Sequence, residues 1–338
     1  MNPPLRLRLD GAALTANWRW LAKASGPAAC GSAVKADGYG LGAKGVVARL
    51  VKAGCRDFFV ATWTEAEALG PLPDQCVLSV LHGVRAEDME FAVQSSARPV
   101  LSTVEQVVRW RETGRPCDVM VDTGMNRLGI STWDATDGLL DGLQVETLMS
   151  HLACADEDSV MNDRQRSAFV AITAPARRRS LANSAGICLG SDYSFDLTRP
   201  GLALYGGVPR KEASGHISQV AFPEAQVVQR RRVASGDSIG YGATFVATRD
   251  TDVSILNIGY ADGYLRSFSS KGTCGNGRFP VLGRVSMDLI AIDVTGADVA
   301  EDDWVGIDYD LPTAAVLSGL SQYELLTGLG RRFERAWF

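Results

Sequence analysis

Short apolar runs and amphipathic stretches alternate along roughly the first two thirds of the chain. The run 31–34 is strand-like, and apolar residues then recur at helical spacing up to Gly54, a residue typical of a helix C-terminus. A second strand-like run, 58–61, precedes Thr64 and Glu67, a Thr-x-x-Glu capping box that predicts another helix. Such alternation predicts βα units.

Eight strands of this kind are expected, over residues 31–34, 58–61, 77–81, 99–101, 119–122, 145–150, 181–184 and 202–205. Eight strands that alternate with helices favour a parallel (β/α)8 barrel, of the TIM type, over an open doubly wound sheet. We therefore expect residues 9–215 to form an α/β barrel domain.

After about residue 215 the pattern changes to short strands separated by Gly and Asp turns. These strands are expected over residues 226–233, 244–247, 253–258, 279–282, 290–294 and 304–308, and a last helix over 321–329. The sequence thus predicts a second, mainly β domain over residues 216–338, which a strand from residues 1–8 is expected to join.

Composition and charge exclude some partners. The chain has 338 residues, 46% hydrophobic and 22% charged, which suits a globular enzyme of two domains. Its net charge of -5 leaves no basic face for nucleic acid, and no apolar run is long enough to predict a membrane span or a signal peptide. The seven cysteines lie singly, as reduced thiols do, so we expect a cytoplasmic protein.

Lys35 directly follows the first predicted strand, at the barrel end where reactive residues collect. Burial depresses the pKa of a lysine and makes its amine a better nucleophile, which suits a Schiff base with an aldehyde cofactor. The alternative is a strand-end lysine that reaches solvent or pairs with Asp37, and from these residues alone it is the commoner case.

Other strand ends carry groups that suit an anion. Ser184 and the backbone around Gly201 offer a hydroxyl and amides to a phosphate, although ordinary turns use the same residues. Arg127 and Arg199 offer guanidinium donors to an anionic oxygen or a ring nitrogen, or form surface ion pairs. His151 lies in no cluster of His, Cys or acidic residues, so no metal site is expected.

In the second half, Tyr241 lies between two glycines. Flanking glycines expose a side chain, and they also mark an ordinary β-turn. The segments around Tyr260 and Met287 have the same character, since each places polar groups at a predicted strand end.

Taken in chain order, these segments resemble the alanine racemases, which are fold-type III pyridoxal-phosphate enzymes. The matching motifs span nearly the whole chain: AVKADGYG at 33–40, VDTGMNRLG at 121–129, SHLACAD at 150–156, RPGLALYG at 199–206, GYGAT at 240–244, GYADG at 259–263 and SMD at 286–288. Several motifs in a fixed order are far more specific than any one of them.

The resemblance implies that pyridoxal 5'-phosphate is bound covalently through Lys35. Its phosphate would be held by four residues, namely Tyr39, Ser184, Gly201 and Leu202. The resemblance also implies three contacts to the cofactor ring: Arg127 at the phenolic oxygen, His151 against the ring face and Arg199 at the pyridine nitrogen. An arginine there limits the electron sink and so suppresses transamination.

The resemblance further implies a homodimer with the active sites at the subunit interface and a small amino acid, alanine, as substrate. Racemisation removes the α-proton on one face and returns a proton on the other, so it needs two proton-transfer groups. Lys35 is implied for one face and Tyr241 of the other subunit for the opposite face. Arg127, Met287 and Tyr260 are implied on the substrate side. Serine or a broader set of substrates stays open, as does a biosynthetic or catabolic role.

Two positions depart from the pattern of the family. Met120 stands where many members carry a carbamylated lysine, so something else is expected to steady Arg127. The segment 328–335 lacks a clear counterpart of the tyrosine that often reaches the phosphate, and Arg331 is nearest.

Two other classes share the cofactor. Amino-acid decarboxylases with the same architecture use a cysteine followed by an acid-rich segment, which Cys274 in Thr-Cys-Gly-Asn-Gly does not match. Non-catalytic cofactor carriers are single barrels, so the second half with Tyr241 argues against that class.

Overall fold

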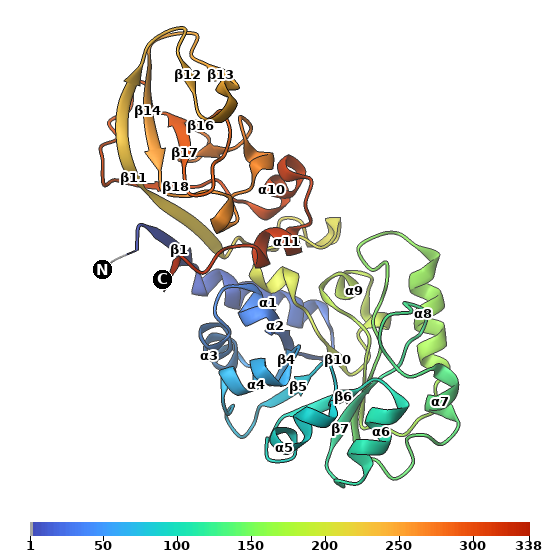
Figure 1. Ribbon diagram of the computed structural model, residues 1–338. Coiled ribbons are helices and arrows are strands. Elements are labelled where there is room, and N and C mark those ends of the chain that lie inside the picture. Colours follow the sequence, from blue (N-terminus) through green and yellow to red (C-terminus); the bar gives the residue numbers. More distant parts are fainter. Residues whose placement is uncertain (1–2) are drawn as a thin grey trace. The chain divides into compact units, whose positions relative to one another are not determined.

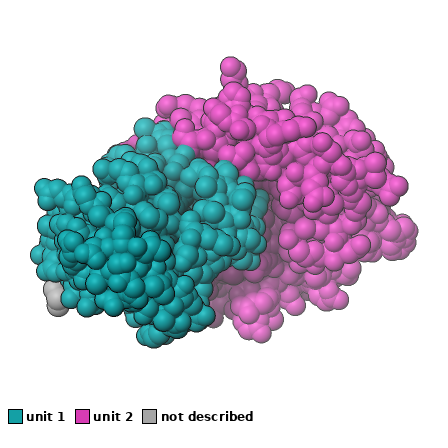
Figure 2. Space-filling model, turned by 90° about the horizontal axis from the view of Figure 1, so that it is seen from above, with its two compact units in different colours: residues 1–13, 219–338 teal, residues 14–218 magenta. Residues whose placement is uncertain are grey.

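The computed structural model describes residues 3–338 and contains two compact units, which Figure 2 colours separately. One unit comprises residues 14–218, here called the barrel unit. The other comprises residues 3–13 with 219–338 and is here called the β-rich unit; residues 1 and 2 of the predicted strand 1–8 lie outside the described residues. Each unit has its own sheet and is described by itself.

The barrel unit is built on a curled parallel sheet (Figure 1). Within the described residues its seven strands are hydrogen-bonded in chain order. They are β3 (Ser32–Ala33), β4 (Asp57–Val60), β5 (Val77–Val80), β6 (Arg98–Leu101), β7 (Cys117–Met120), β8 (Val145–Met149) and β9 (Arg178–Ser180). All four residues of β4 and of β7 are buried, as expected for strands covered on both faces.

A short eighth strand continues this sheet. β10 (Leu197–Thr198) pairs in parallel with β2 (Ala29–Cys30), which directly precedes β3 in the chain. On its other side, the amide of Asp196 donates to the carbonyl of Arg179 at 3.0 Å. β10 therefore connects the last strand of the sheet to the first, and the predicted (β/α)8 barrel is confirmed.

Two of the eight predicted strands are misplaced. Residues 202–205 form the 3-10 helix η3 (Leu202–Tyr205), and β10 takes the expected place of the eighth strand. The predicted strand 181–184 lies after β9, and its last residue begins α9 (Ser184–Cys188). All four residues of η3 are buried, and a short buried helix shows the same apolar run as a buried strand.

One helix precedes the barrel strands, and the others follow them. Up to residue 218 they are α1 (Gly11–Ala24), α2 (Lys35–Tyr39), α3 (Ala43–Ala53), α4 (Trp63–Leu69), α5 (Met89–Ala92), α6 (Val104–Arg111), α7 (Thr132–Thr136), α8 (Val160–Ala171) and α9, with the 3-10 helices η1 (Ala86–Asp88), η2 (Ser191–Tyr193), η3 and η4 (Lys211–Ala213). Gly54 ends α3 at a φ of 116°, as its glycine predicts. The predicted capping box at Thr64 is wrong, because Thr62 caps α4 by accepting from the amide of Glu65.

The β-rich unit is organised around β11 (Ala221–Val233), whose first seven residues alternate between buried and half-buried. Its other strands are β1 (Leu5–Leu9), β12 (Ser238–Ile239), β13 (Phe245–Val246), β14 (Thr251–Leu256), β15 (Thr273–Cys274), β16 (Phe279–Leu282), β17 (Ile290–Asp293), β18 (Trp304–Gly306) and β19 (Glu334–Trp337). β1 lies between β11 and β19, so both ends of the chain contribute to one sheet.

Short helices complete the β-rich unit. They are α10 (Leu311–Ser318), α11 (Gln322–Thr327), η5 (Tyr241–Ala243), η6 (Tyr260–Asp262) and η7 (Arg266–Phe268). Ser321 and Glu324 form a capping box at the start of α11, inside the predicted last helix. Among the described residues, no helix has the length and apolar character that a membrane crossing requires.

An ion pair crosses the interior of the barrel. Asp57 on β4 is buried and accepts two hydrogen bonds from Arg178 on β9, at 2.7 and 3.2 Å. β4 and β9 are not neighbours in the sheet, so this ion pair links two strands that share no backbone hydrogen bonds. The pair stabilises both charged groups, because leaving one of them buried without its partner would be costly in free energy.

We predict that Arg178→Met lowers the free energy of unfolding of the barrel by roughly 3 kcal/mol, because it leaves the carboxylate of Asp57 without its partner. Arg177→Met changes the net charge equally, but the Arg177 side chain is 78% exposed. That control should cost about 1 kcal/mol or less. Urea unfolding of both variants tests the difference, and equal losses would contradict it.

Candidate active site

Lys35 follows β3 and opens a strained backbone segment. The next residues of α2 are left-handed, with φ values of 53° at Ala36, 52° at Asp37 and 64° at Gly38. Tyr39 continues the run at a φ of 55°. A non-glycine residue pays roughly 1–2 kcal/mol for this conformation, so surrounding contacts must hold the segment in place.

The amine of Lys35 lies in a cationic environment. Burial lowers its pKa, Arg127 and Arg199 lower it further, and only the nearby carboxylate of Glu65 among these groups raises it. A lowered pKa increases the fraction of neutral amine, which is the nucleophilic form. The environment of Lys35 therefore lowers its pKa, which distinguishes it from an ordinary exposed lysine.

The four residues predicted to hold a phosphate, Tyr39, Ser184, Gly201 and Leu202, lie close together and form a small cradle. The hydroxyl of Ser184 accepts from the amide of Gly201 at 2.9 Å and from the amide of Ala203 at 3.3 Å. Leu202 lies between these two amides and is buried. A Cβ at Gly201 would lie 2.2 Å from the hydroxyl oxygen of Tyr39, so only glycine permits this close approach.

His151 follows β8 and is held by its backbone, because Gln165 donates to its carbonyl at 2.9 Å. Burial, together with the positive charges of Arg199, Arg127 and Lys35, lowers the pKa of its imidazole from 6.5 to about 3. The imidazole is therefore neutral at physiological pH.

Arg199 follows β10 and is buried. It donates to the carbonyl of Ser150 at 2.6 Å and to the hydroxyl of Ser180. Burial lowers its pKa to about 10, so the guanidinium remains protonated at neutral pH. Neutral oxygen acceptors fix its position and leave its positive charge for a ligand.

Arg127 lies in an exposed loop after β7. Met120, at the end of β7, is buried and offers that loop no charge. Asp122 instead accepts from the amides of Gly124 at 2.7 Å and Arg127 at 3.1 Å. The backbone of this loop is thus fixed by an aspartate within the loop itself.

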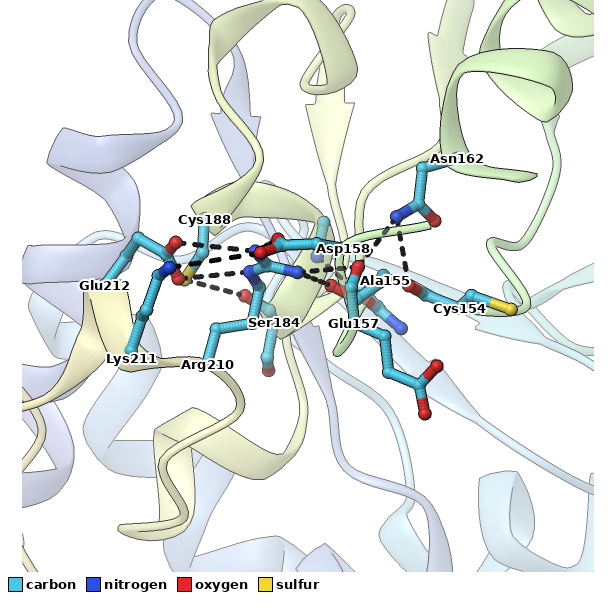
Figure 3. A network of polar contacts seen from close by, with 12 residues as sticks. Cys154, Ala155, Glu157, Asp158, Asn162, Ser184, Cys188, Arg210, Lys211 and Glu212 are labelled. Atoms are coloured by element: carbon cyan, nitrogen blue, oxygen red, sulfur yellow. Dashed lines mark hydrogen bonds and ion pairs between the residues drawn. The ribbon is translucent and has the colours of Figure 1, made fainter. Parts of the chain in front are cut away.

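The structure also shows an anchor for the segment after His151 that the sequence did not reveal (Figure 3). Arg210 donates to the carbonyls of Ala155 at 3.0 Å and Glu157 at 2.8 Å, and it also binds the carboxylates of Asp158 and Glu212. Its side chain is buried. Nothing in the sequence pattern around residue 210 distinguishes this arginine from a surface residue.

In the β-rich unit, Tyr241 lies in the turn between β12 and β13. Gly240 and Gly242 have φ values of 76° and 71°, and the Tyr241 side chain is 67% exposed. Tyr260 and Met287 lie on adjacent segments, since the amide of Tyr260 donates to the carbonyl of Ser286 at 3.0 Å. Met287 is also exposed, whereas Tyr260 is partly covered.

Arg332 joins these two segments and was also missed from the sequence. It binds the fully buried Asp262 through two hydrogen bonds of 2.6 and 2.7 Å, and Asp288 at 2.7 Å. Asp262 ends η6, which begins at Tyr260, and Asp288 follows Met287. One guanidinium therefore fixes the backbone on which both of these predicted substrate-side residues are carried.

The family is decided by matches that cover both units. The family model "Alanine racemase, N-terminal domain" matches residues 9–209, and "Alanine racemase, C-terminal domain" matches residues 220–337. The chain belongs to the alanine racemase family. This confirms the resemblance inferred from the sequence.

Curated alanine racemases match over nearly the whole chain. That of Jannaschia sp. is 43% identical, with 98% of each chain covered. The biosynthetic alanine racemase of Agrobacterium fabrum is 39% identical, with 99% of this chain and 94% of the relative covered. Alanine racemase from Bartonella henselae with covalently bound pyridoxal phosphate matches with a TM-score of 0.89 and 34% identity over 99% of both chains.

Alanine racemases use pyridoxal phosphate, and the barrel residues fit this cofactor. The amine of Lys35 suits its aldehyde. The hydroxyl oxygen of Ser184 accepts from the amides of Gly201 and Ala203, so its hydrogen can be donated to a phosphate. The protonated Arg199 supplies a donor for a ring nitrogen. Among the residues that the structure describes, no group of His, Cys, Asp and Glu could hold a metal ion.

We predict that His151 makes the protein less stable in acid. Its pKa is lower in the folded protein than in the unfolded chain, so the unfolded chain takes up the proton first as pH falls. Stability is therefore lost as pH falls from about 6.5 towards about 3, by up to about 1.4 kcal/mol per pH unit from this residue.

Urea unfolding at neutral pH and at about pH 5 measures this slope. His151→Gln should flatten it, whereas His82→Gln, at an exposed histidine, should leave it unchanged. If both variants keep the slope of the parent protein, the assignment to His151 is wrong.

Proposed function

We propose that the protein interconverts L- and D-alanine by two-sided proton transfer, with Lys35 on one face of the α-carbon and Tyr241 on the other. Pyridoxal phosphate, when bound, supplies a conjugated ring that stabilises the negative charge left when the α-proton is removed. The single observation that carries the proposal is the set of groups gathered around Lys35, whose amine is shifted towards its neutral form.

The barrel, expected over residues 9–215, would hold the cofactor. Lys35 would bond to its aldehyde, and the hydroxyl groups of Tyr39 and Ser184 with the backbone of Gly201 and Leu202 would hold its phosphate. The close packing of Tyr39 on Gly201 and the bonds from backbone amides to Ser184 support this assignment. They bring the hydroxyl groups of Tyr39 and Ser184 and the backbone of Gly201, which follow separate barrel strands, into one cradle.

Three further residues would orient the ring and the substrate. Arg127 would contact the phenolic oxygen and the substrate carboxylate, and the neutral imidazole of His151 would pack against the ring. Arg199 would donate to the pyridine nitrogen. Because it remains charged, protonating that nitrogen as well is costly, which limits the electron sink and favours racemisation over transamination.

The second face would be served by Tyr241 of the partner subunit in a homodimer, with Tyr260 and Met287 on the substrate side. The β-rich domain, expected over residues 216–338 with the strand at 1–8, carries all three. The exposure of Tyr241 and Met287 supports this proposal, because proton transfer needs a site from which water is largely excluded. Another subunit would provide that cover.

The competing decarboxylase assignment finds no support. Cys274, its candidate cysteine, is fully buried, and burial raises the pKa of its thiol far above the ordinary value. A reactive cysteine needs the opposite environment. All seven cysteines are free thiols, which supports a reducing compartment, and we propose the cytoplasm.

Replacing the proposed cofactor lysine tests the first half of the proposal. Lys35→Ala should abolish racemisation of alanine, followed by optical rotation, and should retain no covalently fixed cofactor after borohydride treatment. Lys44→Ala, at an exposed lysine on α3, should behave like the parent protein in both assays. Covalent cofactor retained in Lys35→Ala would refute the assignment.

Replacing the proposed phenol tests the second half. In deuterated water, Tyr241→Phe should lose α-proton exchange from one enantiomer of alanine by about 100-fold or more, and much less from the other. Tyr323→Phe, at another exposed tyrosine, is the matched control. Equal losses for the two enantiomers would show that Tyr241 does not serve a single face.

A further inference from the structure

Glu65 links two neighbouring strand ends of the barrel. One of its carboxylate oxygens accepts from the amide of Ala61 at 2.7 Å, and the other accepts from the amide of Ala36 at 2.8 Å. Ala61 directly follows β4, and Ala36 directly follows Lys35, which begins α2 shortly after β3. Both oxygens are thus committed to backbone amides, in charge-assisted hydrogen bonds that are stronger than neutral ones.

This contact falls where the backbone is most strained. Ala36 is the first left-handed residue after Lys35, with a φ of 53°. Asp37 supports the same segment from within, because it accepts from the amide of Ala43 at 2.8 Å. Glu65 supplies the support from outside the segment, and it acts on the peptide next to Lys35.

The charge of Glu65 has a second consequence. Three charged side chains act on the amine of Lys35, and two of them, Arg127 and Arg199, carry positive charge. Glu65 alone among the three is negative. Its carboxylate therefore opposes the cationic field and limits how far the lysine shifts towards the neutral form.

We infer that Glu65 is a positioning residue for Lys35: its carboxylate fixes the peptide that follows the lysine and balances the positive charge around the amine. The inference rests on the proposed role of Lys35 in proton transfer. It assigns Glu65 no contact with the cofactor or the substrate.

Three variants separate charge from backbone support. Glu65→Gln removes the charge and leaves only one side-chain oxygen for two amides, whereas Glu65→Asp keeps the charge with a shorter reach. Glu67→Gln makes the same charge change two residues further along α4, at an exposed position. It is the matched control.

The first measurement is hydrogen exchange of the holoenzyme. Glu65→Gln should exchange about tenfold faster in peptides that contain Ala36 or Ala61, because at least one amide loses its acceptor. The second is the pH profile of kcat, which reports groups in the enzyme–substrate complex. In Glu65→Gln the midpoint assigned to Lys35 should move to lower pH by about half a unit or more. It should stay in place in Glu65→Asp and Glu67→Gln.

The outcomes are distinct. Faster exchange together with the shifted midpoint supports the inference. Faster exchange with an unchanged midpoint means that Glu65 is only structural, and parent-like behaviour in both measurements means that it does neither; each overturns the inference. Failure of the proposed function shows instead in the parent protein, as an absence of alanine racemisation.

Discussion

The site depends on one constraint: several positively charged side chains lie close together at the ends of the barrel strands. Burial lowers the pKa of His151, and the positive charges of Arg199, Arg127 and Lys35 lower it in the same direction. Such an arrangement is costly without an anion, since like charges repel strongly where water is excluded. A ligand with a phosphate and a substrate with a carboxylate would offset that cost, so the charge pattern itself favours an anionic cofactor.

The fold provides this placement through rigid elements and local strain. Strands fix where each side chain emerges, and the segment after β3 turns sharply through left-handed residues between Lys35 and Tyr39. Arg210 and Arg332 restrain longer loops with several hydrogen bonds each. Proton transfer needs donors and acceptors held in fixed positions, and these restrained segments provide that rigidity.

Much of the barrel could be predicted because buried parallel strands leave continuous apolar runs, and β4 to β8 lie close to their expected positions. β16 has the bounds expected for it. The prediction failed at residues 202–205, where the run is equally apolar but Gly201 packs against Tyr39 and the chain turns into a 3-10 helix. Close approach between distant residues decides that turn, and periodicity carries no information about it.

The same distinction applies to the site. Lys35, Arg199 and Tyr241 stand at strand ends or between glycines, so local sequence and the resemblance pointed to them. Glu65 binds backbone amides of other segments, and Arg332 binds carboxylates of other segments. Only tertiary packing sets such partners. Their sequence neighbourhoods resemble ordinary helix and strand surfaces. A positioning residue is therefore harder to predict than the group it positions, although the chemistry needs both.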